Sequence, residues 1–325
     1  MISVKHLTKY YGTHLAVDDI SFEIESGHVY GFLGPNGAGK STTMNIMTGC
    51  LSATEGSVLI DGHDIFEEPD AAKKCIGYLP EHPPLYMNES PQEYLSFVAE
   101  AKGLRGAELK AQVEEVIAKT GIEAVKHRRI SQLSKGYKQR VGIAQALLGN
   151  PKVIILDEPT VGLDPIQIIE IRDLIRDLGR THTVIFSSHI LSEVQAICDQ
   201  IVMIVGGKLV ALGAPEDLQK QLLAPNEIIL TTNAPTNALA QLVTDIRNIS
   251  ELTAEKSGSY TEVRIKTDRE DIYSLSADIF RAFARSTWLL LEMSLKKGNL
   301  EDVFLELTDN TESTVAQSEN KEDKA

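Results

Sequence analysis

The chain has 325 residues, of which 42% are hydrophobic and 24% charged, as in an ordinary soluble globular protein with two domains, or with one large domain and an appendage. Its formal net charge of −14 argues against a nucleic-acid partner, because such proteins present a basic face to the phosphates. Its three widely spaced cysteines form no C-x-x-C pair, which argues against a disulfide framework or a zinc site and suits a reducing cytosol.

The chain opens with residues 1–33, which read as short strands separated by glycine turns. The first residues lack the apolar segment of a signal peptide. The longest apolar runs, at 153–156, 201–205 and 288–291, are far shorter than the ~20 residues that a membrane span needs. We therefore expect any role at a membrane to depend on a partner.

The middle of the chain alternates between strand and helix patterns. Periodicity changes at residues 91–149, which predicts a helical subdomain, about 85–150, inserted between strands. Around it we expect a helix at 40–49, short strands at 56–62 and 75–80, buried parallel strands near 153–156 and 183–188, a helix at 165–179 and a hairpin at 200–213.

After residue 220 the pattern changes again, which places a domain boundary there and a first domain over residues 1–220. Strand-like segments lie at 226–232, 260–267 and 289–297, with helical stretches near 235–247 and 270–285. The order β-α-β-α-β predicts a small α+β accessory domain over 221–308. Residues 309–325 are polar and acidic without periodicity, and we expect a disordered tail.

The motif with the strongest chemical meaning is "GPNGAGKS", which matches the phosphate-binding pattern G-x-x-x-x-G-K-[ST] without a mismatch. Glycines in a strand-to-helix turn let backbone N–H groups approach a phosphate closely, and the helix N-terminus adds partial positive charge. Lys40 would reach the β- and γ-phosphates and Ser41 would place its hydroxyl on Mg²⁺. The sequence therefore predicts a nucleoside triphosphate site.

A second motif, "VIILDEP", delivers two carboxylates to the end of a buried strand. Asp157 would hold Mg²⁺, and Glu158 would orient and deprotonate the attacking water. No N-K-x-D sequence for reading guanine is present, which disfavours a G-protein.

With "LSKGYKQR" at 133–140, followed by "LDEPTVGLD", residues 1–220 resemble the nucleotide-binding subunits of ABC transporters. The resemblance implies an α/β P-loop NTPase of ABC type, with an antiparallel β subdomain, a parallel-sheet core and the inserted helical subdomain, joined here to the small C-terminal domain. It also implies MgATP binding and ATP hydrolysis. The matching positions are Tyr11 for the aromatic that stacks on adenine; Gly34, Pro35, Asn36, Gly37, Ala38, Gly39, Lys40, Ser41 and Thr42 for Walker A; Asp157 and Glu158 for Walker B and the catalytic glutamate; Asp164 for the D-loop; and His189 for the switch histidine.

Two positions depart from the family pattern. The signature, typically LSGGQ, reads Leu133-Ser134-Lys135-Gly136-Tyr137 here and keeps the serine hydroxyl and the unhindered glycine. At the Q-loop the family has glutamine and this chain has Glu81, a carboxylate that can still ligate Mg²⁺ but adds negative charge beside a triphosphate. The other histidines and Trp288 are assigned no functional role.

The resemblance also implies partners. Two subunits of this family pair head to tail, so that each signature closes over the other's nucleotide, and residues 82–130 are the usual contact with a membrane permease. We therefore expect a dimer, most simply a homodimer, placed on the cytoplasmic face of a membrane by a permease, with no nucleic acid bound. "LEDVFLELT" at 300–308 and the "YLPE" and "LSKGYKQR" variants resemble ATPases that serve ABC-2 type exporters.

Other interpretations stay open at this point. A soluble ABC ATPase acting on ribosomes or DNA would usually carry two such domains, or long insertions, and a basic surface. An importer subunit shares the same ATPase domain, and a sensor that hydrolyses poorly is disfavoured because Glu158 and His189 are both present. The C-terminal extension would in one alternative only regulate or stabilise the dimer.

Overall fold

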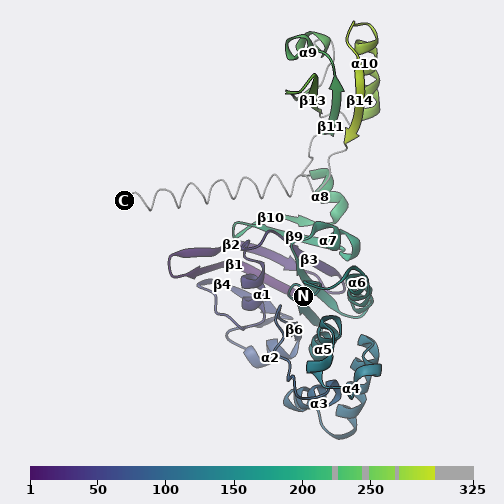
Figure 1. The fold of residues 1–325 in the computed structure, drawn as a ribbon. Coiled ribbons are helices and arrows are strands. Elements are labelled where there is room, and N and C mark those ends of the chain that lie inside the picture. The colour runs from purple at the N-terminus through teal and green to yellow at the C-terminus, as the bar shows by residue number, and fades with distance from the viewer. Residues whose placement is uncertain (222–225, 244–248, 268–270, 297–325) are drawn as a thin grey trace. The chain divides into compact units, whose positions relative to one another are not determined.

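The computed structural model describes residues 1–221, 226–243, 249–267 and 271–296 (Figure 1). The chain divides into two compact units, the first from Met1 to Leu218 and the second beginning at Gln219. The predicted tail at 309–325 and the segment at 300–308 lie outside the described residues.

The first unit contains an antiparallel sheet of four strands in the order β2-β1-β4-β5. Its strands are β1 (Ile2–Tyr11), β2 (His14–Ile24), β4 (Glu55–Ile60) and β5 (His63–Asp64). Valine, isoleucine and phenylalanine alternate with polar residues in β2, so one face of this sheet is buried.

A second sheet of six strands, in the order β10-β9-β3-β8-β7-β6, forms the centre of this unit. Five strands are parallel, and β10 pairs with β9 in the antiparallel sense. The strands are β3 (Val29–Leu33), β6 (Ile76–Leu79), β7 (Val153–Leu156), β8 (Thr183–Ser188), β9 (Gln200–Val205) and β10 (Lys208–Gly213). Because the strands are parallel, the residues that follow β3, β7 and β8 all emerge at one edge of the sheet.

Helices pack around and beside these sheets, and Figure 1 shows α3, α4 and α5 near one another at one end of the unit. Helix α3 begins with a capping box, in which the Ser90 hydroxyl and the Glu93 carboxylate satisfy each other's backbone N–H groups. The helices are α1 (Lys40–Met47), α2 (Pro69–Lys74), α3 (Pro91–Ala101), α4 (Gly106–Thr120), α5 (Lys135–Leu147), α6 (Pro165–Gly179), α7 (Leu191–Ile197) and α8 (Pro215–Gln221), with short 3-10 turns at Glu123–Val125 and Ile130–Gln132.

The core of the first unit lies between the two sheets and α1. Phe32 of β3 and Met44 of α1 are fully buried, and the Phe22 ring of β2 meets Phe32 edge to face at a centroid distance of 5.7 Å. This packing fixes β3 and α1 relative to each other and so fixes the loop between them.

The second unit is an antiparallel sheet in the order β12-β13-β11-β14 with two helices. Its elements are β11 (Asn226–Thr232), α9 (Thr236–Val243), β12 (Glu251–Ser257), β13 (Tyr260–Thr267), α10 (Ile272–Ala284) and β14 (Leu290–Lys296). Ile228, Val263, Ile265, Leu275 and Ile279 form the centre of its core.

The predicted fold class is confirmed, with one correction in the small unit. The sequence predicts three strands there, whereas the structure has four, in the order β-α-β-β-α-β. The missed strand, β12, lies at the edge of its sheet, and only Leu252 and Ala254 along it are partly buried. A strand is predicted from apolar residues that alternate with polar ones. An edge strand that buries few side chains has few such apolar residues, so this pattern is weak.

Candidate active site

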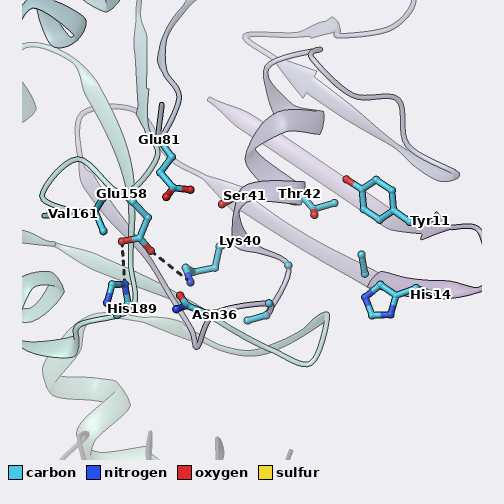
Figure 2. A pocket seen from close by; sticks show the side chains of 14 residues that line it. Tyr11, His14, Asn36, Lys40, Ser41, Thr42, Glu81, Glu158, Val161 and His189 are labelled. Atoms are coloured by element: carbon cyan, nitrogen blue, oxygen red, sulfur yellow. Dashed lines mark hydrogen bonds and ion pairs between the residues drawn. The ribbon is translucent and has the colours of Figure 1, made fainter. Parts of the chain in front are cut away.

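A pocket of about 460 Å³ opens where the loops after β3, β7 and β8 meet (Figure 2). Most of its lining residues are ones that the sequence motifs mark. The lining consists of Tyr11, His14, Ala16, Asn36, Gly37, Ala38, Gly39, Lys40, Ser41, Thr42, Glu81, Glu158, Val161 and His189.

The glycines of the loop between β3 and α1 are there for two different reasons. Gly37 and Gly39 have φ values of +79° and +101°, a conformation that strains residues with a Cβ. Gly34 meets a close approach instead, because a Cβ on it would lie 2.1 Å from the Ile204 carbonyl oxygen of β9. The resulting loop presents backbone N–H groups and the positive end of α1 to the pocket, which suits a phosphate.

Lys40, the first residue of α1, is only 5% exposed. Its Nζ donates hydrogen bonds to the Gly34 oxygen at 2.8 Å and the Pro35 oxygen at 3.1 Å, and lies 3.8 Å from Glu158 Oε1. Burial lowers the pKa of Lys40, and the carboxylates of Glu158 and Asp157 oppose that shift. The ammonium group is therefore held at the phosphate loop by neighbours that favour its charged form.

Asp157 joins the phosphate loop to β8. Its Oδ1 accepts hydrogen bonds from Ser41 Oγ at 3.1 Å and from Ser187 Oγ at 2.6 Å. Ser41, Asp157 and Glu81 supply only oxygen donors, which are the ligands that Mg²⁺ prefers. No group of three or more His, Cys, Asp and Glu side chains able to hold a metal occurs among the described residues.

Glu158 and His189 face each other across the pocket, as Figure 2 shows. His189 Nδ1 lies 3.1 Å from Glu158 Oε2, and the Glu158 backbone N–H donates to Ser187 Oγ at 2.7 Å. Glu158 has a φ of +46°, a left-handed conformation that a non-glycine residue keeps only when its surroundings impose it. The carboxylate is thus held over the loop, where it can accept a proton from a water molecule.

At the far end of the pocket, Tyr11 ends β1 and His14 begins β2, and the two residues are paired in the hairpin register. Tyr11 is 48% exposed, and its ring can stack on a planar base. His14 is a lining residue that the sequence analysis missed, because the pairing that places it beside Tyr11 is a property of the hairpin and no motif marks it. Ala16 also lines the pocket without a motif, and Val161 lines it from within the "LDEPTVGLD" stretch, where it was assigned no role.

The signature residues lie around a second pocket of about 410 Å³, lined by Gly121, Ser134, Gly136, Tyr137, Arg140, Asp164, Ile166, Gln167 and Glu170. Ser134 and Asp164 cap α5 and α6, accepting hydrogen bonds from the N–H groups of Tyr137 and Gln167. Leu133 is buried and Lys135 is exposed, and neither lines this pocket. Within the part of the chain that the structure describes, no signature residue lines the first pocket.

Comparison with known proteins gives consistent results. Residues 17–161 match the family model described as "ABC transporter". The chain is 35% identical over 319 residues to the "Uncharacterized ABC transporter ATP-binding protein YhcH" of Bacillus subtilis, covering 97% of this chain and 98% of that one. It is 32% identical over 312 residues to the "Linearmycin resistance ATP-binding protein LnrL" of the same organism, covering 96% and 99%.

Among solved structures, the chain is similar to a dimeric post-hydrolysis state of the ATP-binding cassette MJ0796 bound to ADP and Pi. The TM-score is 0.60 at 26% identity, over 66% of this chain and 98% of that one. Within the described residues, no helix is both long enough and apolar enough to cross a bilayer.

Proposed function

The chain belongs to the ABC transporter family, in which it is an ATP-binding subunit and an ATPase, and we propose that it drives an ABC-2 type exporter through a separate membrane permease. The observation that carries the catalytic part is the Lys40–Glu158–His189 arrangement over the phosphate loop. The relative named for linearmycin resistance supports export, since removing a toxic compound is one route to resistance. The 300–308 segment, on which the exporter resemblance also depends, lies outside the described residues.

Most residues of the first pocket, together with Asp157, have a part in this proposal. Tyr11 stacks on the adenine, the backbone N–H groups of residues 34–42 surround the phosphates, and Lys40 pairs with the β- and γ-phosphates. The Ser41 hydroxyl and the carboxylates of Asp157 and Glu81 would hold Mg²⁺. When bound, Mg²⁺ neutralises negative charge on the phosphates.

Hydrolysis is assigned to the loop after β7. Glu158 orients the attacking water and accepts its proton, and His189 holds the Glu158 carboxylate and contacts the γ-phosphate. Glu158 is 8% exposed, so its surroundings exclude most water and strengthen these charge interactions. No other side chain is required as a base.

The movement that drives transport is assigned to the closing and opening of a dimer of two ATP-binding subunits. A signature helix that lines its own pocket, separate from the phosphate loop, suits a head-to-tail dimer in which Ser134 and Gly136 of one chain close over the nucleotide of the other. The dimeric state of the MJ0796 cassette supports this arrangement. ATP binding then draws two copies of this chain together and hydrolysis releases them, which is a ligand-driven population shift.

The permease contact is assigned to the helical subdomain. Tyr86, Met87 and Phe97 are 51%, 47% and 53% exposed, and the Tyr86 and Phe97 rings lie 5.4 Å apart. Exposed aromatic and methionine side chains gathered in this way suit a protein partner. Through this contact the chain works at the cytoplasmic face of the cell membrane.

A pull-down tests the proposal. A tagged Glu158→Gln chain is held closed with ATP, and the proteins retained from detergent-solubilised membranes of its own cell are identified; Lys40→Ala, which cannot close on ATP, is the control. We expect a multi-span permease at near-equal stoichiometry with Glu158→Gln, and less with the control. Ribosomal or DNA-bound proteins without a permease would overturn the transport role.

A further inference from the structure

Glu193 is a buried carboxylate that the nucleotide pocket does not use. It lies in the first turn of α7 and is 2% exposed. Its Oε2 accepts hydrogen bonds from Thr160 Oγ1 at 2.7 Å and Ser188 Oγ at 2.9 Å, and its Oε1 lies 3.7 Å from Arg172 Nη2. A carboxylate can stay charged at such a depth because these partners replace the water it has lost.

The partners of Glu193 come from three separate segments. Thr160 lies two residues after Glu158, Ser188 lies directly before His189, and Arg172 belongs to α6. Ser188 also accepts the Ile190 N–H at 3.0 Å, so its hydroxyl fixes the turn that follows His189. A single carboxylate therefore connects the two loops that carry Glu158 and His189.

The loops that carry Glu158 and His189 need contacts from other parts of the chain to hold their conformation. Glu158 holds a φ of +46°, and its contact with His189 at 3.1 Å joins two side chains that approach from different strands. The bond from the Glu158 N–H to Ser187 fixes one side of the β7 loop, and the Thr160–Glu193 bond fixes the other. Arg172 Nε is buried without a hydrogen-bond partner in the described part of the chain, so the guanidinium group interacts with this cluster chiefly through charge.

We infer that Glu193 is a positioning residue for ATP hydrolysis, which holds the Glu158 and His189 loops in the arrangement that turnover requires. This inference rests on the roles proposed for Glu158 and His189. Glu193 touches neither the nucleotide pocket nor the reacting atoms, so its effect is on the rate of the chemical step and not on nucleotide affinity.

Two substitutions of Glu193 distinguish the effect of its hydrogen bonds from the effect of its negative charge. Glu193→Gln keeps a carbonyl oxygen with two lone pairs for Thr160 and Ser188, while Glu193→Ala removes the acceptor altogether. Glu93→Ala is the control, because Glu93 is likewise a glutamate in the first turn of a helix, α3, and it does not line the nucleotide pocket.

The experiment measures kcat, KM and MgADP affinity for these three variants of the full chain, with Glu158→Gln alongside. We expect Glu193→Ala to lower kcat about tenfold to a hundredfold, the cost of a small misplacement of catalytic groups, with MgADP affinity unchanged. Glu193→Gln should keep kcat within about threefold of wild type, because its neutral hydrogen bonds replace both hydroxyl contacts. Glu93→Ala should keep wild-type kcat.

Three outcomes overturn the inference: wild-type kcat in Glu193→Ala, the same loss in Glu193→Gln as in Glu193→Ala, or a loss of MgADP affinity that equals the loss of kcat. Rates are expressed per mole of nucleotide-binding protein, so a partly unfolded sample does not imitate a loss of kcat. If Glu158→Gln turns over like wild type, the proposed role of Glu158 fails. If Glu158→Gln is inactive and Glu193→Ala is active, only the role of Glu193 fails.

Discussion

At the scale of single residues, Glu81 places a negative charge beside the phosphate loop where the family pattern has a neutral glutamine. Its side chain is 43% exposed, lines the nucleotide pocket and acts on Lys40 through its charge. Because a carboxylate attracts a divalent cation more strongly than an amide does, we expect Glu81→Gln to keep ATPase activity and to need several-fold more Mg²⁺ for half-maximal rate, a difference of about 1 kcal/mol at a partly exposed site.

The measurement is ATPase rate against free Mg²⁺ at saturating ATP. Glu89→Gln is the matched control, because Glu89 is exposed and lies outside the pocket. An Mg²⁺ titration that does not move in Glu81→Gln would show that this carboxylate takes no part in holding the ion.

Lys40 supports a second prediction at this scale. Wild-type chain with MgADP at about 100 times its Kd should gain about 2.7 kcal/mol of stability, which is a rise in Tm of roughly 5–10 °C. Lys40→Ala should lose most of this rise, because it removes the ammonium group held at the phosphate loop.

The measurement is a thermal melt of each variant with and without MgADP. Lys208→Ala is the control, since Lys208 is 68% exposed and pairs with Asp18 at the surface. A full MgADP-induced rise in Lys40→Ala would remove Lys40 from the phosphate site.

At the scale of elements, two serines are the N-cap residues of two helices. Ser90 caps α3 and accepts the Glu93 N–H at 3.4 Å, and Ser134 caps α5 and accepts the Tyr137 N–H at 3.3 Å. Replacing either serine with alanine should lower stability by about 1 kcal/mol, the usual cost of losing an N-cap. Only Ser134→Ala should also lower ATP turnover, because only Ser134 lies in the signature pocket.

Chemical denaturation and steady-state ATPase assays check this pair together. Equal turnover in the two variants would mean that the Ser134 hydroxyl acts only as a helix cap.

The elements also show what a sequence can and cannot predict. The loop after β3, the strand β7, which ends directly before Asp157, and the helix α6 depend on local patterns such as glycine spacing and apolar periodicity, and the structure contains all three. Strand β12 escaped prediction because an edge strand needs little apolar surface. The pairing of His14 with Tyr11 escaped because it depends on the register of the hairpin, which no motif marks. The bonds from Thr160 and Ser188 to Glu193 escaped because they depend on tertiary geometry.

At the scale of the whole molecule, the two pockets predict that activity needs two chains. The phosphate loop lines one pocket and the signature lines the other. A substitution in the phosphate loop of one chain therefore leaves the signature of that chain intact for the nucleotide of its partner. Lys40→Ala and Ser134→Ala should each be inactive alone. In a mixed dimer, the phosphate loop of the Ser134→Ala chain meets the intact signature of the Lys40→Ala chain, which restores one of the two sites.

The measurement is ATPase activity after the two purified variants are mixed in equal amounts. Random pairing of a two-fold dimer makes half of the dimers mixed, each with one sound site, so about a quarter of wild-type activity should return. The activity per chain should also fall on dilution, since dissociation of the dimer separates each phosphate loop from the signature that completes it. A mixture that stays inactive, while both variants fold and Ser134→Ala still binds MgADP, would contradict head-to-tail pairing and confine hydrolysis to a single chain.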